Sequence, residues 1–228
     1  RARRLSAAAL AALVLVVALG AVAAVRLWTQ RSDTGTAAEV EARPVADQGP
    51  DFVWQPYAQG HDLPVSRTAG PTRQSGGRAA GFARTELGAA LAAIHLSQRV
   101  DAAAGPKVFE PTIREQVVGP DADKLRERTN AAYDQGRKEE GKAPGQPLDL
   151  GPANVAGYRI EAFTPDAATV AVFSAYDDDR SHVFSFRHDL RWIDDDWHLV
   201  APTGGDLSTT LTRLPSFPPG TVVLSKGA

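Results

Sequence analysis

The chain has 228 residues, 43% of them hydrophobic, and its formal net charge is -2. This length allows one good hydrophobic core with appended segments, and the count of zero Cys excludes disulfides, thiol catalysis and thiolate zinc sites. The first 28 residues contain four Arg and no acid, so the remainder carries 21 basic against 27 acidic side chains, which argues against a general grip on nucleic acid.

The most apolar stretch is Ala7–Val25, which contains no charged side chain. As a helix it would span roughly 28 Å, close to the thickness of a hydrocarbon core. Three Arg residues precede it and favour a cytoplasmic N-terminus. We therefore expect a basic tail and a transmembrane helix over residues 1–28, with everything after them extracytoplasmic. The alternative is a cleaved signal peptide, because small residues near the end of the stretch offer a cleavage site, and cleavage would give a secreted binding protein.

Residues 29–50 are polar and show no apolar period, so they predict a flexible tether. Residues 51–81 predict an extended arm and a Gly-containing loop. The arm opens with an aromatic cluster that includes Trp54 and Tyr57. Two interpretations of this cluster stay open. Its side chains fill a groove of their own domain, or they form an exposed docking site for a partner.

Three helices are predicted next. The longest covers residues 82–103, with Thr85 as a candidate N-cap and apolar residues recurring near helical spacing. The dipeptide Gly105–Pro106 predicts its end. A short helical piece is expected over residues 111–118 and a third, mostly solvated helix over residues 121–136.

After a polar connection the apolar period changes from helical to alternating. Strands are predicted around residues 158–162 and 170–174, and a hairpin is predicted over residues 183–202. Helices followed by strands predict an α+β domain over residues 82–202. The remaining residues, 203–228, are expected to form a C-terminal tail.

The order of these elements resembles the nuclear-transport-factor-2-like fold, also called cystatin-like. The terminal pair LRWIDDDWHLV is common in that fold. The resemblance implies a cone in which about three helices pack on a curved four-stranded antiparallel sheet.

An anchor, a tether and an extracytoplasmic cone together resemble the assembly proteins of type IV secretion, including the TcpC-like proteins of conjugation. The segments WQPY, LPVSRTAGP, GFARTELGAALAAIHLSQR and FEPTIREQVVG resemble uncharacterised actinobacterial membrane proteins associated with conjugative or integrative elements. The likeness spans residues 54–202. It implies contacts with the membrane through residues 7–25 and with other envelope or conjugation proteins, and a homo-oligomer is a further alternative.

Two histidines are the only catalytic pair that we draw from the sequence. His95 falls on the long predicted helix beside Ile94, and His188 shares the strand alternation of its apolar neighbours. Within hydrogen-bond reach of each other in a polar cavity, they could serve a small-molecule isomerase or hydrolase. The other interpretation makes His188 a satisfied or rim-facing histidine without a chemical role.

Acidic triplets occur at residues 177–179 and 194–196. Calcium would use such oxygens, but neither triplet has the 12-residue loop of a calcium site, so tight turns are the better prediction. The sequence predicts no catalytic residue, metal or cofactor. We therefore expect a non-catalytic, membrane-anchored interaction domain.

Overall fold

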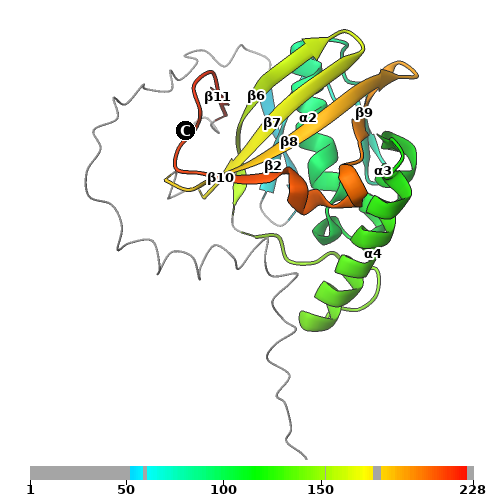
Figure 1. The fold of residues 1–228 in the computed structure, drawn as a ribbon. Coiled ribbons are helices and arrows are strands. Elements are labelled where there is room, and N and C mark those ends of the chain that lie inside the picture. Colours follow the sequence, from blue (N-terminus) through cyan, green and yellow to red (C-terminus); the bar gives the residue numbers. More distant parts are fainter. Residues whose placement is uncertain (1–51, 59–60, 152, 177–180, 225–228) are drawn as a thin grey trace, which may run out of the picture. The chain divides into compact units, whose positions relative to one another are not determined.

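The computed structural model describes residues 52–58, 61–151, 153–176 and 181–224 (Figure 1). The chain divides into two units, Arg1–Glu39 and Val40–Ala228, and every described residue belongs to the second. The predicted transmembrane helix, the tether and the acidic triplet at 177–179 lie outside the described residues. Within the described residues, no helix is both long and apolar enough to cross a membrane.

Two small hairpins come first in the described chain, and three helices follow. The hairpins are β1 (Phe52–Ala58) with β2 (His61–Ser66), and β3 (Arg73–Ser75) with β4 (Arg78–Ala80). The helices are α2 (Glu86–Val100), α3 (Pro106–Gln116) and α4 (Ala122–Glu139), with a short 3-10 turn, η1 (Ala102–Ala104), between the first two.

A mixed sheet of seven strands forms the larger part of the fold. Its strands are β5 (Val117–Val118), β6 (Asn154–Thr164), β7 (Ala167–Ala175), β8 (Val183–Ile193), β9 (Asp196–Val200), β10 (Leu211–Leu214) and β11 (Val222–Val223). The strand order is β11-β6-β7-β8-β9-β5, and β10 also pairs with β8. All pairs are antiparallel except β5 with β9.

The predicted four-stranded cone is therefore wrong. The four predicted strands are present as β6 to β9, but β5, β10 and β11 extend their sheet to seven strands and make it mixed. The three added strands have two, four and two residues. Strands of this length carry too few residues to show an alternating pattern, so only their partners on distant segments identify them.

Helix α2 packs across β6, β7, β8 and β9 (Figure 1). Its Ala-rich sequence lets it lie close to the sheet, and Leu91, Ile94 and Leu96 are completely buried. Each such side chain contributes about 1.5–3 kcal/mol when removed from water. The predicted N-cap is confirmed, since Thr85 accepts a hydrogen bond from the backbone N–H of Gly88 at 3.1 Å.

Strands β10 and β11 attach the C-terminal segment to the sheet on either side of β7. β10 pairs with β8, whereas β11 pairs with β6, so residues 215–221 pass from one to the other. Leu214 and Phe217 pack there on a second apolar cluster of Ala171, Phe173 and Val183. The segment predicted as a tail thus completes the sheet and covers part of its face.

Candidate functional site

His95 lies on the buried side of α2, where both ring nitrogens have partners. Its Nε2 is 2.8 Å from the carbonyl oxygen of Pro64, and its Nδ1 is 3.1 Å from Nη1 of Arg99. A carbonyl only accepts, so Nε2 carries the proton and Nδ1 accepts from Arg99. Burial, followed by the charge of Arg99, lowers the pKa of His95 to about 3. His95 is a neutral structural link between the helix and β2.

His188 lies on β8 directly opposite Val170 of β7, and these two residues therefore share the sheet face that packs on α2. Its side chain is buried, and its Nε2 has no hydrogen-bond partner within the described part of the chain. Desolvation lowers the pKa of His188 to about 4, although Asp189 opposes the shift. No hydrogen bond joins His188 to His95 among the described residues. The second histidine thus behaves as a core residue with one unsatisfied nitrogen.

A buried arginine, Arg99, is the polar group that sequence reasoning missed. Arg99 is only 4% exposed, and no carboxylate of the described residues forms an ion pair with its guanidinium. Instead it donates to the carbonyl oxygen of His95 at 3.1 Å and to Oε1 of Gln74 at 3.2 Å, while Nε has no partner. Desolvation lowers the pKa of Arg99. A cation on a helix is normally solvated, so nothing in the local sequence indicates this burial.

The two residues predicted as docking candidates, Trp54 and Tyr57, pack on their own domain. Both are partly buried against the main core. The hydroxyl of Tyr57 donates to the carbonyl oxygen of Gln98 at 3.0 Å, and the Arg99 guanidinium lies over the Tyr57 ring. Burial raises the pKa of Tyr57 to about 12. These contacts favour the groove-filling interpretation.

The acidic triplet at 194–196 divides into two roles. Asp194 and Asp195 form the two-residue turn between β8 and β9 with φ values of 49° and 61°, which are typical of a type I′ hairpin. The Asp196 carboxylate instead accepts the backbone N–H groups of Gly81 at 2.6 Å and Phe82 at 3.0 Å. The predicted turn is confirmed for two of the three residues. The third residue, Asp196, joins the β8–β9 hairpin to the segment before α2 by these hydrogen bonds.

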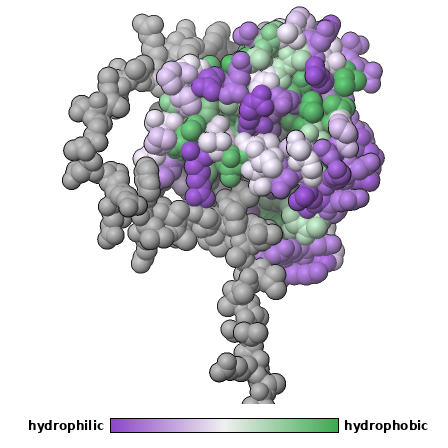
Figure 2. Space-filling model, in the orientation of Figure 1, coloured by the Kyte–Doolittle hydropathy of each residue, from purple (hydrophilic) through white to green (hydrophobic). Residues whose placement is uncertain are grey.

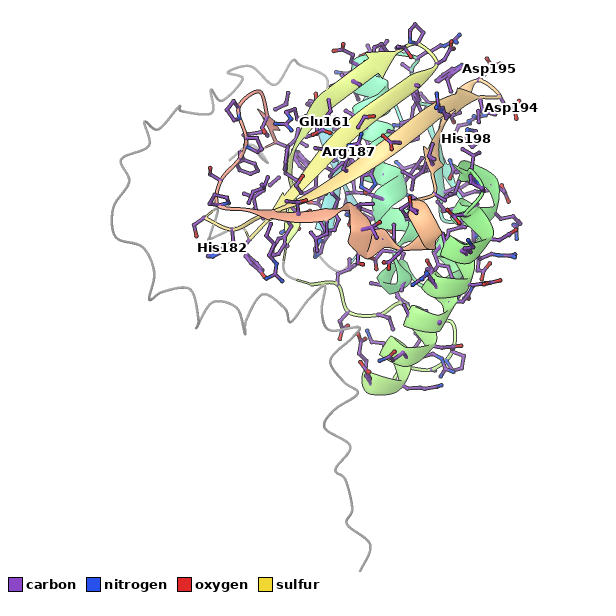
Figure 3. The ribbon with its side chains drawn as sticks, in the orientation of Figure 1. Glu161, His182, Arg187, Asp194, Asp195 and His198 are labelled. Carbon is purple, nitrogen blue, oxygen red and sulfur yellow. The ribbon has the colours of Figure 1, made fainter. Side chains whose placement is uncertain are left out.

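The exposed face of the sheet carries an ion-pair network in which Glu161 is central. Arg159 donates to Oε1 of Glu161 at 2.7 Å and Arg187 donates to Oε2 at 3.1 Å. Figure 3 shows Glu161 and Arg187 close together on this face. The Arg159–Glu161 pair lies within β6, and the Arg187–Glu161 pair reaches from β8 across β7. Because these charges satisfy one another, they are explained as ion pairs of a solvated surface.

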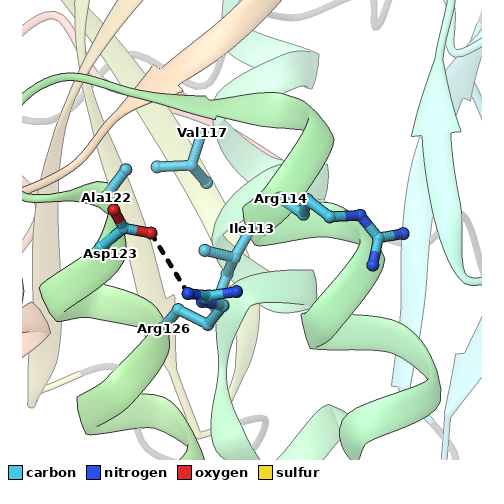
Figure 4. A pocket seen from close by; sticks show the side chains of 6 residues that line it. All are labelled: Ile113, Arg114, Val117, Ala122, Asp123 and Arg126. Carbon is cyan, nitrogen blue, oxygen red and sulfur yellow. Dashed lines mark hydrogen bonds and ion pairs between the residues drawn. The ribbon is translucent and has the colours of Figure 1, made fainter.

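A small hollow opens between α3 and α4 (Figure 4). It is lined by Ile113, Arg114, Val117, Ala122, Asp123 and Arg126. Its volume of about 100 Å³ lies well below the roughly 300 Å³ at which small-molecule sites begin. Figure 4 shows the guanidinium of Arg114 turned away from Asp123 and Arg126. This hollow has room for water or one small side chain rather than for a substrate.

Basic side chains gather at the β3–β4 hairpin and the neighbouring helix α3. Arg73 and Arg78 share the outward face of the hairpin, because Ser75 is the register partner of Arg78. Lys107 and Arg114 lie seven residues apart on α3 and are exposed. We call Arg73, Arg78, Lys107 and Arg114 the cationic face.

An ion pair between Arg78 of the hairpin and Glu115 of α3 joins the two parts of the cationic face. Glu115 is held by Arg78 on one side and by Arg114, at 2.9 Å, on the other. The tip of the hairpin touches the start of α3, since a Cβ on Gly77 would lie 2.8 Å from the carbonyl oxygen of Lys107. Within the described ranges, no cluster of three or more His, Asp or Glu could hold a metal ion.

Comparison with known proteins gives one match. Residues 20–218 match the model of a family described as a domain of unknown function (DUF8175). No curated protein and no solved structure matches the chain.

Proposed function

Since the chain belongs to the DUF8175 family, a domain of unknown function, we propose its role from its sequence and its geometry together: a non-catalytic, membrane-anchored domain that binds other proteins of the cell envelope. In this proposal residues 7–25 span the membrane, the N-terminus is cytoplasmic, and the described residues are extracytoplasmic. The partners belong to a conjugation or type IV secretion-like assembly, as the resemblance of the sequence segments implies.

The observation that carries this proposal is the filling of the space between α2 and the sheet. Ile94 from the helix and Trp197 from β9 are both completely buried there. The ring of Trp192 lies 5.3 Å from that of Trp197, and the Trp197 Nε1 donates to the carbonyl oxygen of Ala83. A substrate would need this volume. The side chains that occupy it support a role for the outer surface instead.

The polar groups of the interior support the same conclusion. Both ring nitrogens of His95 have hydrogen-bond partners, and Arg99 donates hydrogen bonds to His95 and Gln74. A general base needs a nitrogen that can reach a substrate proton. His188 has a free nitrogen but lies on the sheet face against α2. Figure 2 shows a mainly hydrophilic face with scattered apolar residues, as expected for a surface in contact with water.

The test is recovery of partners by the full-length chain. A C-terminally tagged chain would be expressed in its own host, crosslinked in intact cells, solubilised with mild detergent and purified, and the co-purifying proteins would be identified by mass spectrometry. A chain with the same anchor and tether joined to an unrelated domain is the control. Specific enrichment of envelope or conjugation components is expected. Equal recovery by the control would overturn the proposal.

A further inference from the structure

The cationic face is positively charged, whereas the chain as a whole is negatively charged. It consists of Arg73, Arg78, Lys107 and Arg114. The whole sequence has a net charge of -2, yet within the described residues Glu115 is the one carboxylate that forms an ion pair with any of these four cations. Arg73 and Lys107 form no ion pair with any described residue, and the Arg114 side chain is 62% exposed. The other acid on α3, Glu110, accepts a hydrogen bond from the neutral side chain of Asn130 on α4 and keeps its charge, so two carboxylates on α3 offset the four cations in part. A local excess of positive charge therefore remains accessible.

A second observation reinforces this excess. Arg99 lies behind the hairpin, where its Nη2 donates to the Gln74 side chain of β3 at 3.2 Å. Its charge is buried and is not neutralised by an ion pair within the described residues. A buried charge is screened by water less than an exposed one, so it adds to the positive potential at the hairpin surface.

The arrangement at Glu115 indicates the chemistry of the ligand. Two arginines, Arg78 and Arg114, approach the two oxygens of one carboxylate from different elements. Arginine forks are suited to carboxylates, and such pairs are stronger than neutral hydrogen bonds. A carboxylate of a partner protein would bind the arginines next to Glu115 in the same way as Glu115 does.

We propose that the cationic face is the docking surface for an acidic segment of a partner protein. This inference rests on the proposed function, because it identifies the surface through which the domain would bind. Carboxylates of the segment pair with Arg73 and Lys107 and share Arg114 with Glu115. A protein segment is favoured over a lipid surface because the face offers arginine pairs and no large apolar side chain: among the described residues, the exposed large hydrophobic residue is Val53 of β1.

The experiment measures fluorescence anisotropy of a labelled peptide of alternating Glu and Ser, with a peptide of alternating Gln and Ser as the neutral probe. The protein is the full chain in phosphatidylcholine nanodiscs. We expect the acidic peptide alone to bind, and binding to be lost on raising the salt from about 50 to about 500 mM. The double variant R73Q/R114Q should bind about tenfold more weakly. The variant R137Q/K138Q, on the last turn of α4, removes the same charge and should change binding less than twofold.

Equal weakening by the two double variants, or equal binding of the two peptides, would overturn the inference. Flotation with phosphatidylglycerol vesicles is the second arm, and binding of the vesicles without binding of the acidic peptide would also overturn it. The crosslinked purification separates this inference from the proposed function. If the wild-type chain and R73Q/R114Q recover the same partners equally, the docking surface is wrong while the interaction role stands. Recovery of no specific partner by the wild-type chain overturns the interaction role itself.

Discussion

The guanidinium of Arg99 lies 4.7 Å from the ring centroid of Tyr57, and this contact joins the first described strand to helix α2. The Tyr57 hydroxyl adds a hydrogen bond to the carbonyl oxygen of Gln98, one residue earlier on the helix. Arg99 in turn donates to Gln74 of β3. A single buried cation therefore connects both N-terminal hairpins to the helix that organises the core.

Tyr57 is the residue through which this connection can be tested. Tyr57→Phe keeps the ring under Arg99 and loses one hydrogen bond, so it should lower the free energy of unfolding by about 1 kcal/mol. Tyr57→Ala also loses the ring and its packing and should cost about 3 kcal/mol. Urea unfolding gives both values. Val53→Ala, on the same strand but 51% exposed, should change stability by less than about 0.5 kcal/mol. Equal effects of all three variants would contradict the assignment.

Asp196 holds the β8–β9 hairpin against the segment before α2. Its carboxylate accepts two backbone N–H groups from that segment and one from Trp197 at 2.9 Å. Asp196→Ala leaves these buried donors without an acceptor and should cost about 2–4 kcal/mol in urea unfolding. The matched change Asp195→Gly, at a turn position with φ 61°, should be neutral or slightly stabilising, because Gly adopts this conformation without strain. A larger loss from D195G than from D196A would reverse the two roles.

The buried histidines predict loss of stability in acid. Their pKa values in the folded chain, about 3 for His95 and about 4 for His188, lie below the ordinary value of 6.5. The unfolded chain therefore binds these protons first. Stability should fall as the pH drops from about 6.5 towards 4, by up to about 1.4 kcal/mol per pH unit for each histidine.

Substitution of His188 isolates its share of this pH dependence. His188→Leu removes a titrating group whose Nε2 lacks a partner. The free energy of unfolding of the variant, relative to that of the wild type, should therefore rise by about 2 kcal/mol as the pH falls from 7 to about 4.5. Urea unfolding of both proteins at the two pH values provides the measurement. Parallel losses in the two proteins would show that His188 does not contribute.

Much of the fold follows from local patterns, and the rest depends on distant partners. The period of α2 and the alternation of β6 to β9 are set by residues that face one core, so the sequence shows them. The pair Gly105–Pro106 predicts the end of a helix, yet Pro106 also occupies the first turn of α3, where its missing N–H costs nothing. Strand β5 has no local signal, because its two residues are defined by their pairing with β9.

The same distinction applies to the candidate sites. His95 and His188 could be placed on the core faces of their elements from sequence spacing. The hydrogen bond of His95 could not, because it reaches Pro64 across 31 residues. Asp196 reaches Gly81 across 115 residues, and its triplet gives no sign that one carboxylate turns inward. The cationic face likewise unites residues of a hairpin and a helix that no motif connects.

Gly157 provides a test of how the C-terminal segment closes the sheet. A Cβ at this position would lie 2.8 Å from the carbonyl oxygen of Val222 and 3.1 Å from Cγ2 of Thr221, so β11 could not keep its place beside β6. Gly157→Ala should therefore lower the free energy of unfolding by about 1–3 kcal/mol and speed hydrogen exchange at Leu224, whose N–H donates to the carbonyl oxygen of Ala156 at 2.9 Å. Gly151→Ala is the control, since a Cβ there meets nothing within 4 Å. If both variants exchange at the wild-type rate, the close approach of β11 to Gly157 does not hold the segment in place.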